Sequence, residues 1–196
     1  MSSVVISGDT SGTVTVAAPA VAGSNTLTLL AATATNSVNT LATAVASTSG
    51  TSIDFTGLPS WAKRITVMLG GVSTSGTSAT IIQLGSSTVT TSGYAGSCAS
   101  GSNAASPSVL QPTNGFQIIA EASGSAAYVR QGLVTITYIS ANLWVASGTG
   151  SESANGRFWT TGGTISLGGV LDRVRLTTSG GTDTFDAGSV NILYEG

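Results

Sequence analysis

Histidine is absent from this 196-residue chain, and cysteine occurs only once, at Cys98. Without histidine no Ser-His-Asp or Cys-His catalytic arrangement can form, because both use imidazole as the general base. A single cysteine also excludes a disulfide within the chain, and the lack of histidine excludes a zinc site of the usual nitrogen and sulfur type. We therefore expect a non-enzymatic protein without catalytic residues, cofactor or metal. Cys98 is interpreted as an incidental small residue of a protein made in a reducing cytoplasm.

Charge is scarce as well, since charged residues make up 7% of the chain and the formal net charge is −2. A surface that reads phosphates needs clustered Lys and Arg, so we expect no nucleic-acid partner. No hydrophobic run approaches the roughly 20 apolar residues that a membrane span needs, so we expect no membrane insertion. The N-terminus also lacks the basic and apolar pattern of a secretory signal. A protein with so few charges is expected to associate with copies of itself or with a larger particle.

Short alternating runs of apolar and polar residues dominate what remains, and glycine-rich turns separate them. This pattern is typical of half-buried strands. In the main domain, strands are expected at residues 52–55, 64–72, 79–84, 116–120, 133–139, 143–146, 157–160, 164–167, 172–177 and 189–195. With no convincing amphipathic helix, the pattern predicts an all-β domain over residues 51–196, folded as a jelly-roll-like β-sandwich. Trp61 is expected to close one end of its core.

Two segments fall outside this pattern. Residues 1–50 contain one charged residue, Asp9, and no aromatic residue, so they cannot build a dense core of their own. We interpret them as an extended N-terminal arm, with weak strands at residues 4–7, 13–17 and 25–30, ordered by contact with neighbouring chains; a disordered leader is the alternative. Residues 85–112 are expected to form a long loop, rich in Ser, Gly and Ala.

Aromatic side chains next to polar loops are the candidate recognition residues. Tyr94 is the only aromatic residue of the long loop, and Trp159 follows Arg157 and a polar loop at residues 148–156. Aromatic faces, including that of Trp144, stack on the apolar faces of sugars, which makes a host-surface glycan a conceivable ligand. Packing in the core or at an interface is the simpler interpretation of the same rings.

The acidic residues near the C-terminus suggest two weaker possibilities. Asp172, Asp183 and Asp186 lie close in sequence, and a pair of acids can serve glycoside hydrolysis or hold calcium. The run lacks the alternating acid ligands of a calcium loop, however, and turn aspartates commonly accept backbone N–H groups. We therefore expect turn-capping roles for them.

Two arginines, Arg173 and Arg175, share one face of the strand expected at residues 172–177. The plain interpretation pairs them with Asp172 or Glu195, within the sheet or across a subunit contact. The alternative is a functional one, in which the two arginines bind an anion or a sugar.

Three segments carry a resemblance to known proteins. LDRVRLTT from Leu171 and TDTFDAGSVNILYE at the end of the chain, together with SIDFTGLPSWAKRITVMLGGVSTSGT at residues 52–77, resemble small β-structured domains in tail-fibre and other virion proteins of tailed bacteriophages. SGDTSGTVTVAAPAVAGSNTLTL at residues 7–29 is similar to the Ala/Gly/Thr-rich segment common upstream of such domains.

The resemblance implies a virion structural protein, assembled in the cytoplasm of the host bacterium. Among virion proteins, the role expected first is that of a tail-fibre or fibre-like adhesion protein. Such a protein is expected to be a homotrimer tethered to other virion proteins by its arm. A capsid decoration (cement) or head-fibre protein is the alternative. A glycan depolymerase is a third hypothesis, which the short chain and the missing acid pair do not favour.

Overall fold

The computed structural model describes residues 3–7, 13–17, 39–102, 107–120, 126–153 and 156–196. The chain divides into two compact units, Met1–Asn36 and Ser37–Gly196. In the first unit, strands β1 (Ser3–Ser7) and β2 (Thr13–Ala17) pair as an antiparallel hairpin. These are the strands predicted at residues 4–7 and 13–17; the strand predicted at residues 25–30 lies outside the described residues.

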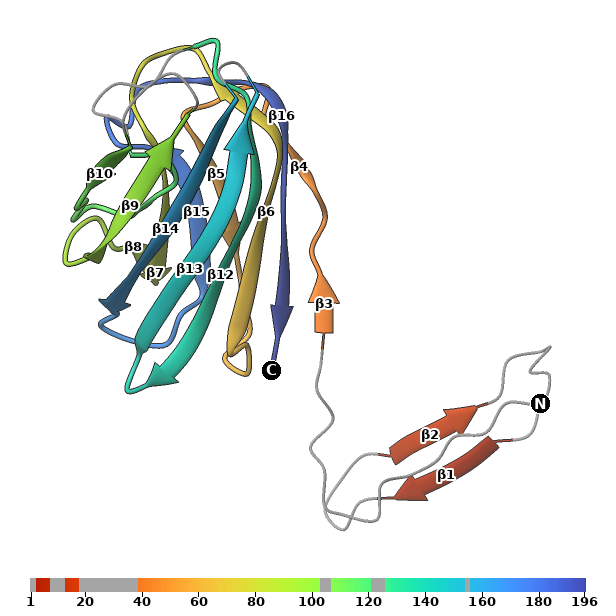
Figure 1. Cartoon of the computed structure of the whole chain (residues 1–196). Helices are drawn as coiled ribbons and strands as arrows, with labels where there is room; N and C mark the ends of the chain where they lie inside the picture. The colour runs from red at the N-terminus through yellow and green to blue at the C-terminus, as the bar shows by residue number, and fades with distance from the viewer. Residues whose placement is uncertain (1–2, 8–12, 18–38, 103–106, 121–125, 154–155) are drawn as a thin grey trace. The chain divides into compact units, whose positions relative to one another are not determined.

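The second unit consists of two antiparallel sheets packed face to face (Figure 1). The larger sheet has the strand order β10-β9-β14-β13-β12-β6-β16-β3, and β4 also pairs with β16. Its strands are β3 (Asn39–Leu41), β4 (Val45–Ala46), β6 (Arg64–Thr74), β9 (Ala95–Gly101), β10 (Ser108–Leu110), β12 (Arg130–Ser140), β13 (Leu143–Glu152), β14 (Arg157–Ser166) and β16 (Phe185–Glu195).

The smaller sheet has the order β11-β7-β15-β5, with β8 paired to β7. Its strands are β5 (Ser52–Thr56), β7 (Thr80–Ser86), β8 (Thr88–Val89), β11 (Phe116–Gln117) and β15 (Arg173–Thr178). The described residues include no helix. The predicted all-β sandwich is therefore confirmed.

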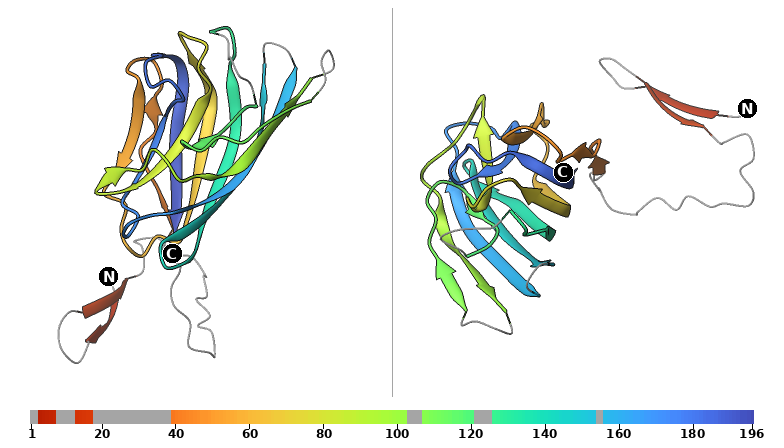
Figure 2. Two further views of the ribbon diagram at one scale, coloured as in Figure 1. Left: turned by 90° about the vertical axis from the view of Figure 1, so that its left-hand side faces the viewer. Right: turned by 90° about the horizontal axis from the view of Figure 1, so that it is seen from above.

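The chain repeatedly crosses between the two sheets, as a jelly-roll-like fold requires. It runs from β5 in the smaller sheet to β6 in the larger, back to β7, over to β9 and back to β11. The three long strands β12, β13 and β14 then form a meander within the larger sheet before β15 and β16 complete the two sheets (Figure 2).

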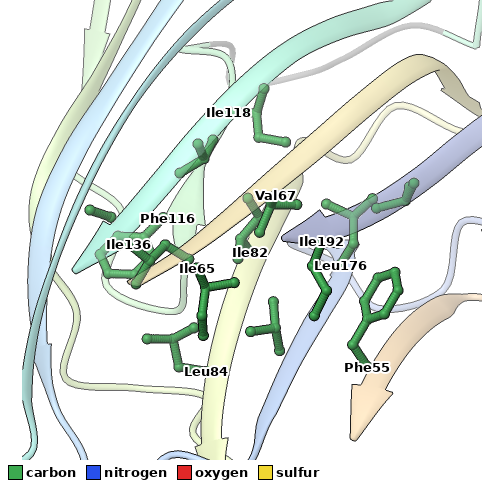
Figure 3. Packing of buried hydrophobic residues seen from close by; sticks show 14 of the residues in the cluster. Phe55, Ile65, Val67, Ile82, Leu84, Phe116, Ile118, Ile136, Leu176 and Ile192 are labelled. Atoms are coloured by element: carbon green, nitrogen blue, oxygen red, sulfur yellow. The ribbon is translucent and has the colours of Figure 1, made fainter. Parts of the chain in front are cut away.

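The core lies between the sheets, and period-two alternation supplies it. On β6, Ile65 and Val67 point inward and are almost fully buried, and Ile82, Leu84 and Leu176 meet them from β7 and β15 (Figure 3). Each buried aliphatic side chain of this size contributes about 1.5–3 kcal/mol relative to exposure. Because β-branched and aromatic residues fill alternate positions, burial fixes the register of both sheets.

The long loop expected at residues 85–112 is a wrong prediction in part, because it contains β8, β9 and β10. Strand β9 has the sequence AGSCASG and pairs with β14 over its whole length. A side chain on Gly96 or Gly163 would collide with the facing backbone, so only small residues allow this pairing. Such residues carry no hydrophobic period, which is why the alternation did not reveal the strand.

Two other expectations also need correction. The sheet begins before residue 51, because β3 and β4 pair with β16, and Ala42 and Ser47 donate backbone hydrogen bonds to Ile192 and Gly188 at 2.9 Å. Trp61 is not a core residue, because it is 39% exposed. Its ring packs against Tyr194, which is itself partly buried against the core, with 5.6 Å between the ring centroids.

Candidate functional site

A hollow lined mainly by polar residues lies on the outer face of the smaller sheet. The cleft has a volume of about 310 Å³. Strands β7 and β15 supply Gln83 and Arg175, which lie directly opposite each other in the register. The segment before β11 supplies Asn114, and the turn at residues 179–181 closes one end. Three segments that are distant in the sequence thus meet here: β7, the segment before β11, and β15 with the turn that follows it.

Hydrogen bonds hold the cleft in a fixed shape. Gln83 Nε2 donates to the carbonyl of Asn114 at 2.7 Å, and Asn114 Nδ2 donates to the carbonyl of Ser179 at 3.4 Å. Thr177 Oγ1 donates to the carbonyl of Thr51 at 2.8 Å. The cleft therefore offers amide and hydroxyl groups in set positions, which suits a neutral polar ligand better than a reacting substrate.

The two arginines are paired, so neither presents an isolated positive charge. Arg175 binds Asp54 through two hydrogen bonds of 2.7 and 3.0 Å, and Arg173 binds Asp172 through two of 2.7 and 3.2 Å. The Arg173 guanidinium, with a hydrogen bond from the Ser87 amide, holds the pKa of Asp172 below its ordinary value. The pairing of Arg173 with Asp172 was expected, whereas Arg175 pairs with Asp54. These pairs do not favour an anion site.

The predicted recognition residue Tyr94 is buried at 3% exposure, so its ring is not available to a ligand. Its hydroxyl accepts a hydrogen bond from the Leu84 amide at 2.7 Å and donates one to the Thr90 carbonyl at 3.1 Å. Its ring meets Phe116 edge-on at 5.0 Å, and burial raises the pKa of the phenol to about 12. The structure gives Tyr94 a packing role.

Trp159 is likewise buried, at 1% exposure, and belongs to the core of the larger sheet. Arg157 lies two residues before it on the same face of β14, with its guanidinium 5.3 Å from the ring centre of Tyr128. Tyr94 adjoins Ala95, which pairs with Thr164, whereas Trp159 pairs five residues away along β14. Tyr94, one residue further along, thus lies about 20 Å from Trp159 along the strands. The three predicted residues form no joint site.

Asp172 and Asp183 accept backbone N–H groups as expected, whereas Asp186 lies within β16 and binds a side-chain hydroxyl. Asp183 accepts a hydrogen bond from the Ser78 amide at 2.7 Å, and Asp186 accepts one from the Ser73 hydroxyl. The described residues contain no group of three or more His, Cys, Asp or Glu side chains placed to hold a metal ion. Cys98 is buried in β9, and burial raises the pKa of its thiol to about 11, so the thiol is protonated and unreactive at neutral pH.

The most unusual chemistry inside the sandwich is a buried pair of opposite charges, which the sequence analysis missed. Arg130 and Glu152 face each other on β12 and β13, with exposures of 0% and 1%. Arg130 Nη1 donates to the Tyr128 carbonyl at 3.4 Å. Within the described part of the chain, Arg130 Nε and Nη2 and both carboxylate oxygens of Glu152 have no hydrogen-bond partner.

A sequence signal for this pair exists. Arg130 is in phase with the inward-facing residues Val134 and Ile136, and Glu152 is in phase with Trp144 and Ala146. Each charge therefore occupies the inward position of its strand, where the alternation calls for an apolar residue.

The pair predicts an unusual dependence of stability on pH. Burial raises the pKa of Glu152 above its ordinary 4.5, and the nearby Arg130 offsets only part of that rise. A raised pKa means that the folded state holds the proton more tightly than the unfolded state, so this group stabilises the fold below pH 4.5. That contribution is lost as the pH rises through the folded-state pKa. We expect urea melts of the wild type, compared with Glu152→Gln, to show this loss; a difference between them that does not change with pH would contradict it.

None of the described elements is a helix with the length and apolarity to cross a membrane. Comparison of the chain with models of known protein families, with curated protein sequences and with solved structures finds no match.

Proposed function

We propose that the protein is a non-enzymatic structural component of a tailed-bacteriophage virion, of the tail-fibre or fibre-like adhesion type, assembled as a homotrimer. The observation that carries the proposal is the division of the chain into a small N-terminal unit, Met1–Asn36, and a β-sandwich, Ser37–Gly196. A short unit that tethers and a compact unit that projects from the particle are what such a component needs. The phage-like segments include β5, β6, β15 and β16 of the sandwich.

The chemistry of the chain supports a structural role over an enzymatic one. The chain has no histidine, its cysteine is buried, and the aspartates of its last third are bound to arginine, a backbone amide or a serine hydroxyl. The polar cleft on the smaller sheet offers a place where a neutral polar group on a host-surface glycan would bind. Such a ligand fits an adhesion protein better than a scaffold.

Purified virions provide the test. Quantitative mass spectrometry should find the protein in the particle at a low copy number, and labelled antibody should place it on the tail by electron microscopy. Many copies spread over the head would instead identify a capsid decoration or head-fibre protein. Absence from the particle would overturn the proposal, and release of oligosaccharide from host polysaccharide would favour a depolymerase.

Truncation separates the role of the N-terminal unit from that of the sandwich. Removing residues 1–36 is expected to leave the free energy of unfolding of the sandwich unchanged within about 0.5 kcal/mol, since its described strands begin at Asn39. The truncated protein should fail to enter particles. Denaturant melts and particle composition measure the two effects, and normal incorporation would show that the unit is not the anchor.

A longer truncation is the matched comparison. Removing residues 1–50 also deletes β3 and β4 and the fully buried Ser47, whose hydroxyl donates to the Ala187 carbonyl at 2.7 Å. Loss of these edge hydrogen bonds is expected to cost about 2–4 kcal/mol, at about 0.5–1.5 kcal/mol each. Equal stability of the two truncations would show that the edge segment adds nothing to the sandwich.

A further inference from the structure

The outward side of the larger sheet is nearly free of charge. We define its outer face by the outward side chains of residues 39–41, 64–70, 95–101, 108–110, 131–139, 143–151, 158–166 and 189–195, which are neighbours in the sheet register. Within these ranges the outward charged side chains are Arg64 and Glu195. They lie opposite each other and neutralise each other through hydrogen bonds of 2.7 and 3.3 Å.

The outer side of the smaller sheet carries more charged side chains for its size. Asp54, Arg173 and Arg175 point outward from only two adjacent strands, β5 and β15. A sandwich with water on both sides would be expected to carry charge on both. On the described strands, three charged side chains thus point outward from β5 and β15 alone, against two from the residue ranges that define the outer face.

Large apolar side chains are exposed on the outer face in place of charges. Leu41, Val109, Leu133, Ile139 and Phe158 are each more than half exposed and lie on four different strands. Partly exposed neighbours extend the apolar area, since Leu133 pairs with Met68 and Leu41 pairs with Leu193. Between them lie Thr, Ser, Gly and Ala. Apolar groups spread over so much of one face mark an interaction surface.

The size of the outer face suits a stable protein contact. Its eight strands, about 4.8 Å apart, span about 34 Å, and the seven residues of β9 run for about 24 Å, which gives about 800 Å². A standard interface buries about 800 Å² on each partner. The face is thus large enough to hold two chains together by itself.

We propose that this outer face is the contact surface between copies of the chain, and that its occupant is a second copy of the chain. The inference rests on the proposed function for the expectation that the protein is a homo-oligomer. A neutral face offers no complement to a strongly charged partner, whereas a second copy buries it without stripping water from an unpaired charge. Small residues between the apolar side chains let two sheets approach to about 10 Å, the usual spacing of packed sheets.

Two matched Thr→Glu substitutions test the contact on the full-length protein. Thr149 is exposed near the centre of the outer face, between Leu133 and Thr160, and Thr56 is exposed on the outer side of the smaller sheet. Light scattering coupled to gel filtration should give the wild type a mass two or three times the 19.2 kDa of one chain. Thr149→Glu should weaken this association by about 100-fold or more, because each copy would bury an unpaired charge in a contact that excludes water. Thr56→Glu should leave it unchanged.

Leu133→Glu, on the neighbouring strand, is the second face variant and should dissociate the oligomer in the same way; circular dichroism confirms that each variant is folded. A wild type that is monomeric at every concentration, or an oligomer that survives both face variants, overturns the proposal. An oligomer insensitive to the face variants leaves the proposed virion role standing. If the protein is absent from virions but the face variants still dissociate its oligomer, the proposed virion role is wrong. The assignment of the contact surface would then still hold.

Discussion

Replacing Trp159 with alanine is expected to lower the free energy of unfolding by about 3–5 kcal/mol, the range for deletion of a fully buried large aromatic side chain. Its ring lies against Gly132 and Gly150, and a side chain on either glycine would collide with it. The two glycines thus form a slot that only the indole fills. Because two walls of the slot are glycine backbone, we expect the cavity to stay open and the loss to fall at the upper end of the range.

Urea melts of Trp159→Ala and Trp61→Ala measure the effect with the same chemical change at two sites. Trp61 is 39% exposed and packs on Tyr194 outside the core, so its removal is expected to cost only about 1 kcal/mol. Gly150→Ala should also destabilise the protein, by about 1–3 kcal/mol, because the added methyl group meets the indole. If the two tryptophan variants lowered the free energy of unfolding by similar amounts, the special role of the glycine slot around Trp159 would be contradicted.

Breaking the buried pair is the second large effect. Arg130→Met leaves the Glu152 carboxylate buried opposite an apolar side chain, and this is expected to cost about 3–5 kcal/mol at neutral pH. The loss should shrink at low pH, because protonation removes the uncompensated charge. The expected result is a steeper decline of stability with rising pH than in the wild type.

The double variant Arg130→Met/Glu152→Leu tests whether the pair lowers or raises the free energy of unfolding. Most of the polar atoms of the pair make no hydrogen bond within the described residues. Hydrogen bonds therefore offset little of the free-energy cost of removing the two charges from water. We expect the double variant to equal the wild type or to exceed it by about 1–4 kcal/mol. A double variant as unstable as Arg130→Met would show that the pair is a net stabilising element.

Alternation predicted the fold where side chains are large enough to show a period. Ile53 and Phe55 identified β5, and Val190, Ile192 and Tyr194 identified β16. The same logic failed for β9, whose residues are too small to mark an inward side, and for the second half of β13, whose inward positions include Gly148 and Gly150. In both strands tertiary pairing, not local composition, creates the structure.

The candidate site was much less predictable than the fold. Gln83, Asn114 and Arg175 come from separate parts of the chain, and only the sheet register brings them to one cleft. Tyr94 and Trp159 were named as candidate recognition residues because polar residues flank them in the sequence, although packing was the simpler interpretation of both rings. Burial of an aromatic ring depends on which face of which strand carries it, and that is fixed by contacts across the sandwich.

The short edge strands β3 and β4 have a mechanical consequence. A pull applied through the residues before Asn39 loads β3 first, and β3 pairs with only three residues of β16. The hydrogen bonds between β3 and β16 would break one after another. Those of β4 would break next, before the force reaches the core strands. The eight residues from Asn39 to Ala46 would release about 27 Å of extended chain. Under such a pull we expect β3 and β4 to detach and lengthen the chain before the sandwich itself unfolds.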